Sequence, residues 1–213
     1  KFGLEFEPKM VDMGPDLYRA DPDWFLSTPN RSASHGLYHH VLDCSRPEVV
    51  DCIYQMVKRI LSEAKISYIK WDMNRSITEC YSAALPADRQ GEVFHRYILG
   101  VYDLYERLTS QFPEILFESC ASGGARFDPG MLYYAPQAWT SDDTDAVERL
   151  KIQYGSSYCY PLSSMGSHVS VCPNHQLNRT TPLYTRANVA YFGTFGYELD
   201  LMKMSEEEQE EVK

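Results

Sequence analysis

The feature of this chain that most constrains its fold is the alternation of short apolar runs with longer amphipathic segments. Strands are expected at residues 2–6, 40–43, 66–69, 115–120, 137–141, 160–165 and 191–198. One helix is expected to open at Ser45-Arg46-Pro47-Glu48, and others are expected over residues 91–110, 143–153 and 181–190. Strands separated by helices are typical of a parallel β/α architecture. The sequence therefore predicts an α/β protein with a parallel sheet.

Two of the expected helices carry a strong apolar stripe. The first is expected to begin with Ser45 as its cap and Pro47 near its first turn. Apolar residues recur at the i, i+3, i+4 spacing that places them on one helix face. In the first helix they are Val49, Cys52, Ile53, Met56, Val57, Ile60 and Leu61, and in the second Val93, Phe94, Tyr97, Ile98, Val101, Leu104, Tyr105 and Leu108.

Polar residues gather where the expected strands end, which favours a (β/α)8 TIM barrel over an open sheet. No glycine-rich dinucleotide or phosphate-binding motif follows a strand, which excludes the common nucleotide-binding folds. About seven strands can be counted, one fewer than a closed barrel requires. The chain also begins inside a strand, so we expect residues 1–213 to be a single, partial catalytic barrel domain that lacks its first strand.

Composition narrows the choice of partner. The formal net charge of −10 argues against nucleic acid and anionic membranes, which need basic patches. No apolar run approaches the roughly 18 residues of a membrane span, and no signal peptide pattern opens the chain. The six cysteines form no CxxC motif, which predicts reduced thiols in a cytoplasmic protein. The negative charge suits a soluble protein with a neutral substrate. Some of the many aromatic residues pack in the core, but carbohydrate sites also use aromatic platforms.

Asp72 is the first candidate for a catalytic residue. It directly follows an apolar strand, where packing gives no reason for a carboxylate. By strand alternation Lys70 and Asp72 share one face, and Trp71 points to the other. A neighbouring lysine favours the ionised carboxylate, which suits a nucleophile. A helix cap, or an ion pair of Asp72 with Lys70 or Arg75, would explain the same residues.

The second candidate lies in Ser141-Asp142-Asp143-Thr144-Asp145, which follows Trp139 at the end of another strand. A group of like charges favours protonation of one member, as a general acid requires. The segment also precedes an expected helix, so capping is expected for at least one of the three aspartates. Two strand ends that each deliver an aspartate beside a tryptophan suggest a carboxylate pair across one sugar-sized cleft.

Other residues could line such a pocket. Cys120 precedes Gly123 and Gly124, in a loop where a ligand could approach the backbone, but it could equally be a small buried hydrophobe. His168 is expected at the end of the strand over residues 160–165. Neither a metal nor a cofactor is predicted, because the candidate histidines match no zinc motif; they are His39, His40, His168 and His175.

A series of short motifs follows in order along the chain. They are Phe2-Gly3-Leu4 with Phe6-Glu7-Pro8, Pro22-Asp23-Trp24, Val41-Leu42-Asp43 with Ser45-Arg46, residues 70–75, residues 118–126, residues 139–145, and Phe195-Gly196-Tyr197-Glu198-Leu199-Asp200. Through these motifs the sequence resembles the bacterial α-galactosidases of glycoside hydrolase family 36 over nearly its whole length.

The resemblance implies the catalytic TIM barrel of that family, with the family's N-terminal β-sandwich and C-terminal β domain outside this chain. It implies retaining hydrolysis of terminal α-galactosyl residues in melibiose- or raffinose-type oligosaccharides, by a homo-oligomer in many members. Asp72 falls on the nucleophile and Asp142 on the acid/base, with carboxyl groups about 5–5.5 Å apart. Together with the residue-level expectations, the substrate-binding set is Lys70, Trp71, Asn74, Cys120, Gly123, Ser141, His168 and Glu5.

Three departures from the family pattern stand out. Glu5 replaces a tryptophan that helps to wall the sugar site, and Leu37 replaces an arginine, unless Arg31 or His39 takes over its role. An Asp-Asp pair of the family's first strand would precede Lys1. Two alternatives therefore stay open. One is a related enzyme with an altered subsite, such as an α-N-acetylgalactosaminidase or a transglycosylating relative, and the other is a non-catalytic carbohydrate-binding barrel.

Overall fold

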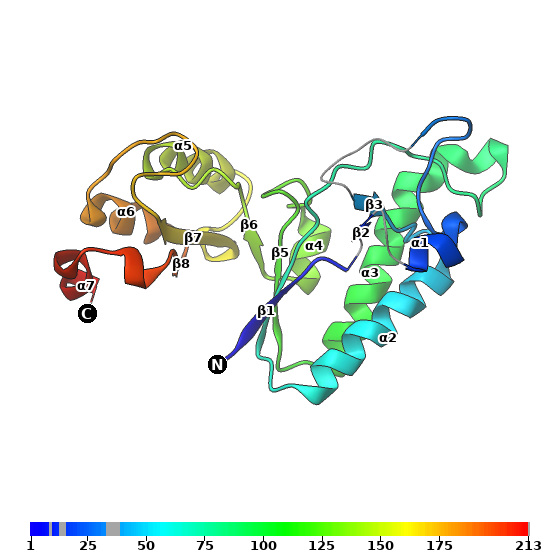
Figure 1. Cartoon of the computed structure of the whole chain (residues 1–213), viewed down its shortest axis with the longest axis horizontal. Coiled ribbons are helices and arrows are strands. Elements are labelled where there is room, and N and C mark those ends of the chain that lie inside the picture. The colour runs from blue at the N-terminus through cyan, green and yellow to red at the C-terminus, as the bar shows by residue number, and fades with distance from the viewer. Residues whose placement is uncertain (9, 13–15, 33–38, 213) are drawn as a thin grey trace. The chain divides into compact units, whose positions relative to one another are not determined.

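The computed structural model describes residues 1–8, 10–12, 16–32 and 39–212, which form two compact units (Figure 1). The first unit contains residues 1–122 and 128–136. The second contains residues 123–127 and the chain from residue 137 onward. Leu37, one of the departures noted above, lies outside the described residues.

The first unit contains three parallel strands. They are β1 (Gly3–Phe6), β4 (Tyr68–Trp71) and β5 (Leu116–Ser119), with β4 between the other two. The two long helices α2 (Pro47–Glu63) and α3 (Val93–Gln111) pack against each other in the same unit (Figure 1). Each helix lies between two strands in the sequence, so the predicted parallel β/α arrangement is confirmed for this unit.

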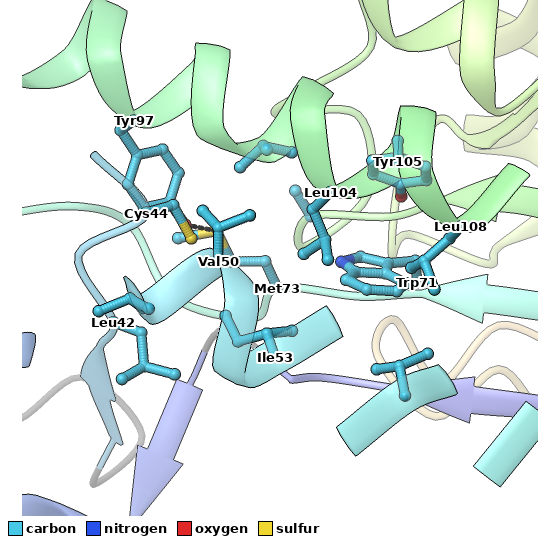
Figure 2. Packing of buried hydrophobic residues seen from close by; sticks show 14 of the residues in the cluster. Leu42, Cys44, Val50, Ile53, Trp71, Met73, Tyr97, Leu104, Tyr105 and Leu108 are labelled. Atoms are coloured by element: carbon cyan, nitrogen blue, oxygen red, sulfur yellow. Dashed lines mark hydrogen bonds between the residues drawn. The ribbon is translucent and has the colours of Figure 1, made fainter. Parts of the chain in front are cut away.

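The core of the first unit is built by the apolar stripes of these helices and one face of the strands. Trp71 of β4 is fully buried, with its ring 5.2 Å from that of Tyr105 and 6.5 Å from that of Phe117. Figure 2 shows Trp71 beside Leu104, Tyr105 and Leu108 of α3. The predicted stripes are largely confirmed, but Met56 and Phe94 are exposed.

Two details of the first unit differ from the sequence prediction. The strand expected at residues 40–43 is β3 (His39–Val41), which pairs antiparallel with β2 (Met10–Asp12) in a separate small sheet. The expected cap Ser45 is wrong, because Arg46 holds the N-cap position and Ser45 donates to the Asp43 carboxylate instead. The short elements α1 (Asp16–Ala20), η1 (Pro22–Trp24), η2 (Ala87–Glu92) and α4 (Pro129–Tyr134) complete the unit.

The second unit also contains three parallel strands. They are β6 (Gln137–Trp139), β7 (Met165–Ser170) and β8 (Thr194–Glu198), with β7 in the middle. The helices are α5 (Ala146–Ser157), α6 (Leu183–Ala190) and α7 (Glu206–Val212), with the short turns η3 (Leu162–Ser164) and η4 (Leu201–Lys203). The strand expected at residues 160–165 is therefore misplaced, since β7 begins at Met165.

The described residues thus supply six parallel strands, three in each unit, where the sequence suggested about seven. The difference is the antiparallel strand β3. Within the part of the chain that the structure describes, no helix combines the length and the apolar character that crossing a bilayer requires.

Candidate functional site

Asp72 lies directly after β4, and its carboxylate is held by the residues that follow it. Its Oδ1 accepts a hydrogen bond from the backbone N–H of Met73 at 2.7 Å, and its Oδ2 accepts one from Nδ2 of Asn74 at 2.9 Å. The side chain is 4% exposed. Residues 73–80 form no helix, so the alternative role of a helix cap does not apply. Two donors therefore hold the carboxylate in one orientation.

Asn74 links Asp72 to the end of the neighbouring strand. Its backbone N–H donates to Oε1 of Glu7, which follows β1, while its side-chain amide donates to Asp72. Asn74 thereby helps to hold the Asp72 carboxylate and also connects the loop after β4 to the loop after β1. Sequence reasoning missed Glu7, whose only signal was its place at the end of an expected strand.

A row of charged side chains crosses the three strands beside Asp72. Glu5 of β1 is in register with Lys70 of β4, and Lys70 is in register with Glu118 of β5. Lys70 Nζ lies 3.3 Å from Glu5 Oε1. Burial raises the pKa of the Glu5 carboxyl, Lys70 opposes this shift, and the nearby Asp72 adds to it. Glu118, which is 1% exposed, was also missed as a site residue.

Trp71 does not belong to this face. Its side chain lies in the core between Tyr105 and Phe117, on the opposite side of β4 from Lys70, and none of it is exposed. The expectation that Trp71 contacts a sugar is therefore wrong, for the reason that strand alternation itself provides. Cys120 is also buried, and its N–H donates to the Trp71 carbonyl. Its contact with a sugar stays a prediction.

The aspartates after β6 have different roles. Asp145 is the N-cap of α5, because its Oδ1 accepts from the backbone N–H groups of Val147 and Glu148. Asp143 accepts from the Asp145 N–H and donates its own N–H to Ser141 Oγ. The expectation that at least one aspartate is a cap is confirmed. Asp142, in contrast, is held through its backbone carbonyl and is exposed.

Side chains from a distant segment hold this loop in place. Gln176 donates to the Asp142 carbonyl at 2.8 Å and accepts from the Thr144 N–H at 3.0 Å. Arg179 forms an ion pair with the buried Asp145. Neither residue was predicted from the sequence, because the contact joins parts of the chain more than thirty positions apart and neither residue lies in a recognised motif.

Arg149 of α5 connects the loop that contains Asp142 to the neighbouring strands. It is 3% exposed, and its guanidinium donates to the carbonyls of Ser141 (3.0 Å) and Gly166 (2.8 Å) and lies 4.4 Å from the Trp139 ring centroid. Burial lowers the pKa of Arg149 to about 10, against the opposing influence of Asp143 and Glu198. One buried cation thereby joins β6, the Ser141 turn and β7.

His168 and Gly123 have structural partners within the second unit. The His168 ring stacks on Trp139 at 4.7 Å, and its Nδ1 lies 3.1 Å from a Glu198 carboxylate oxygen. His168 lies in the middle of β7 and not at a strand end. Gly123 has a φ of 78°, and a Cβ there would lie 2.6 Å from Ser141 Cα. Glycine is needed at this position because the loop approaches Ser141 closely.

The candidate residues therefore form two sets, one in each unit. The first joins Asp72 with Lys70, Asn74 and Glu5, and the second joins Ser141 and Gly123 with the backbone of Asp142. Among the described residues, no group of histidines, cysteines or carboxylates is arranged to hold a metal ion. An ordered carboxylate beside an ammonium group can attack an electrophilic carbon, and an exposed carboxylate can exchange protons.

Known proteins resemble this chain throughout its length. It is 56% identical over 213 residues to alpha-galactosidase AgaA of Geobacillus stearothermophilus and 54% identical over 212 residues to alpha-galactosidase Mel36A of Lactobacillus acidophilus, and each match covers 100% of this chain and 29% of the relative. A crystal structure of the Lactobacillus brevis alpha-galactosidase matches with a TM-score of 0.96 at 57% identity, covering 100% of this chain and 28% of that one.

The chain thus spans less than a third of the length of these relatives. Structures of substituted forms of the G. stearothermophilus enzyme are in complex with raffinose and with stachyose. The strands and helices of the chain follow the parallel α/β fold of these enzymes. A family model described as Melibiase matches residues 1–213. This chain therefore belongs to the melibiase family, glycoside hydrolase family 36.

Proposed function

We propose that the protein carrying this chain is a retaining α-galactosidase that removes terminal α-galactosyl residues from raffinose-type oligosaccharides. The observation that carries the proposal is the Asp72 carboxylate, which is buried at a strand end and oriented by Met73 and Asn74. Membership of the melibiase family and the sugar complexes of the G. stearothermophilus relative support the substrate class.

In the proposed mechanism the Asp72 carboxylate attacks the anomeric carbon while Asp142 protonates the departing glycosidic oxygen. Asp142 then takes a proton from the water that releases the sugar from Asp72. Retaining enzymes keep the two carboxyl groups about 5–5.5 Å apart, which a crystal structure of the whole protein can measure. The proposed site also includes Lys70, Cys120, Gly123, Ser141 and His168, in a (β/α)8 barrel that the rest of the protein completes.

The nucleophile assignment can be tested by chemical rescue in the whole protein. Asp72→Ala should abolish hydrolysis of an activated aryl α-galactoside, and added azide should restore turnover and yield a galactosyl azide. Azide can replace the missing carboxylate because the alanine leaves space for it at the anomeric carbon. Failure of azide to restore turnover would refute Asp72 as nucleophile. An unmodified protein that binds the sugar but never cleaves it would instead favour the non-catalytic alternative.

A second candidate, an enzyme with altered sugar preference, is favoured by Glu5, whose half-exposed carboxyl lies beside Lys70. Rates on aryl α-galactoside and on aryl α-N-acetylgalactosaminide, measured with the same preparation, separate the two candidates. Cleavage of the second substrate alone would overturn the proposed specificity.

A further inference from the structure

Glu5 occupies an unusual position for a surface glutamate. It lies on β1 in register with Lys70, and side chains in register on adjacent parallel strands extend from the same face of the sheet. The Glu5 side chain is 55% exposed, whereas Lys70 is 20% exposed and Asp72, two residues further along the chain on the same face, is 4% exposed. The three groups therefore form a gradient from open solvent to the buried carboxylate.

The Glu5 carboxyl contacts both Lys70 and Asp72 and keeps further acceptor positions for a ligand. One oxygen lies 3.3 Å from Lys70 Nζ, and a carboxylate has about four acceptor positions. Asp72 is close enough to raise the pKa of Glu5, which places the two carboxyl groups on the same local surface. A molecule that contacts Asp72 from this face therefore meets Glu5 as well.

An exposed glutamate in an ion pair often has no role beyond a weak surface contact. The arrangement around Glu5 differs from such a pair. Its lysine is mostly buried, and on the neighbouring strands it is in register with Glu5 on one side and with a second acid, Glu118, on the other. A carboxylate beside a mostly buried ammonium provides an acceptor and a donor side by side, the combination that binds sugar hydroxyl groups.

We propose that Glu5 is a specificity-determining residue whose carboxylate, oriented by Lys70, accepts a hydrogen bond from one hydroxyl group of the sugar that Asp72 attacks. The inference rests on the proposed function. It adds that efficient cleavage requires this hydroxyl group to be present and unsubstituted in the substrate. A site built to bind a hydroxyl group discriminates strongly against an analogue that lacks it, because the site's polar group is then left without its partner.

The test measures kcat/KM of the whole protein for an aryl α-galactoside and for each of its monodeoxy analogues. Glu5→Ala should lower kcat/KM on the parent substrate by about tenfold or more, the range for a hydrogen bond to a charged group. For the one analogue that lacks the bound hydroxyl, the same substitution should have little effect. Glu5→Gln, which keeps an acceptor oxygen, should recover part of the loss on the parent substrate.

Glu48→Ala serves as the matched control, because Glu48 is similarly exposed and paired with Arg46 at the start of α2. It should leave all the rates unchanged. If Glu5→Ala lowers every rate equally, or lowers none, the inference is wrong although α-galactosidase activity stands. If the unmodified protein cleaves no α-galactoside, the proposed function fails, and the inference fails with it.

Discussion

The surroundings of Asp72 and those of Asp142 are held in opposite ways. At Asp72 the contacts reach the carboxylate itself and come from the next two residues of the chain. At Asp142 the contacts reach the backbone and come from other parts of the chain, because Gln176 donates to the Asp142 carbonyl and Arg149 donates to the carbonyl of the preceding Ser141. The first arrangement orients a buried carboxylate, whereas the second holds a loop and leaves the Asp142 carboxylate exposed to solvent. The difference matches the two proposed roles.

The largest expected effects are losses of activity in Asp142→Asn and Asp72→Asn, which should depend differently on the leaving group of the substrate. Asp142→Asn should lower kcat/KM by about 10²–10⁴-fold on an aryl α-galactoside with a poor leaving group, the usual contribution of general acid catalysis. The loss should shrink as the leaving group improves, because a good leaving group departs without protonation. Asp72→Asn should abolish activity on the whole series. The measurement is kcat/KM over substrates of graded leaving-group pKa.

Asp143→Asn provides the control for the Asp142 experiment. Asp143 takes part in the turn through an oxygen that asparagine also offers. Its replacement should therefore leave the leaving-group dependence unchanged. An equal loss for Asp142→Asn at every leaving group would contradict its assignment as the acid.

The next effect concerns the stability of the Asp142 loop. Arg149→Met should lower the free energy of unfolding by about 2–4 kcal/mol, because it leaves the carbonyls of Ser141 and Gly166 without their donor in a buried site. Lys151→Met on the same helix removes an exposed pair with Glu148 and should cost less than about 0.5 kcal/mol. Urea unfolding of both variants gives the comparison, and equal midpoints would contradict the anchoring role of Arg149.

Alanine substitutions at Gly123 and Gly155 test how closely the backbone at Gly123 approaches Ser141 in the Asp142 loop. Gly123→Ala should destabilise the protein by about 1–3 kcal/mol, since its φ is positive and its Cβ would overlap the Ser141 backbone. Gly155 lies in α5 with open space where the methyl group of an alanine would extend, so Gly155→Ala should stabilise by up to about 1 kcal/mol. Thermal unfolding should shift in opposite directions for the two variants, and a shared direction would contradict the close approach at Gly123.

Sequence patterns predicted the fold best where local chemistry and burial agree. The stripes of α2 and α3 and the apolar strand β4 were found because their buried positions are apolar and regularly spaced. The prediction was wrong for β7, whose buried interior includes Ser167 and Ser170 and so lacks an apolar signal. Ser167 is accommodated there because its hydroxyl donates to Gln153, a partner that only the folded chain provides.

The site residues were likewise predicted where the local sequence carries the signal. Asp72 could be predicted because a carboxylate directly after an apolar strand is conspicuous in the sequence and because residues 70–75 form a motif. Arg149, Gln176 and Glu118 could not, since their contacts depend on strand register and on segments that meet only after folding. Trp71 shows the converse, because alternation along β4 already placed it on the opposite face from Lys70, in the core, and the prediction of a sugar contact did not follow that alternation.

The smallest expected effect addresses the local support of Asp72. Asn74→Ala removes the amide donor at 2.9 Å from Oδ2 but keeps the Met73 N–H at Oδ1, so the carboxylate loses one of two supports. We expect kcat/KM to fall about tenfold, as for one hydrogen bond to a charged group. The fall should be the same for poor and good leaving groups, because it acts through the nucleophile. Ser76→Ala, an exposed change in the same loop, should have no effect. A loss confined to poor leaving groups would mean that Asn74 supports the acid and not Asp72.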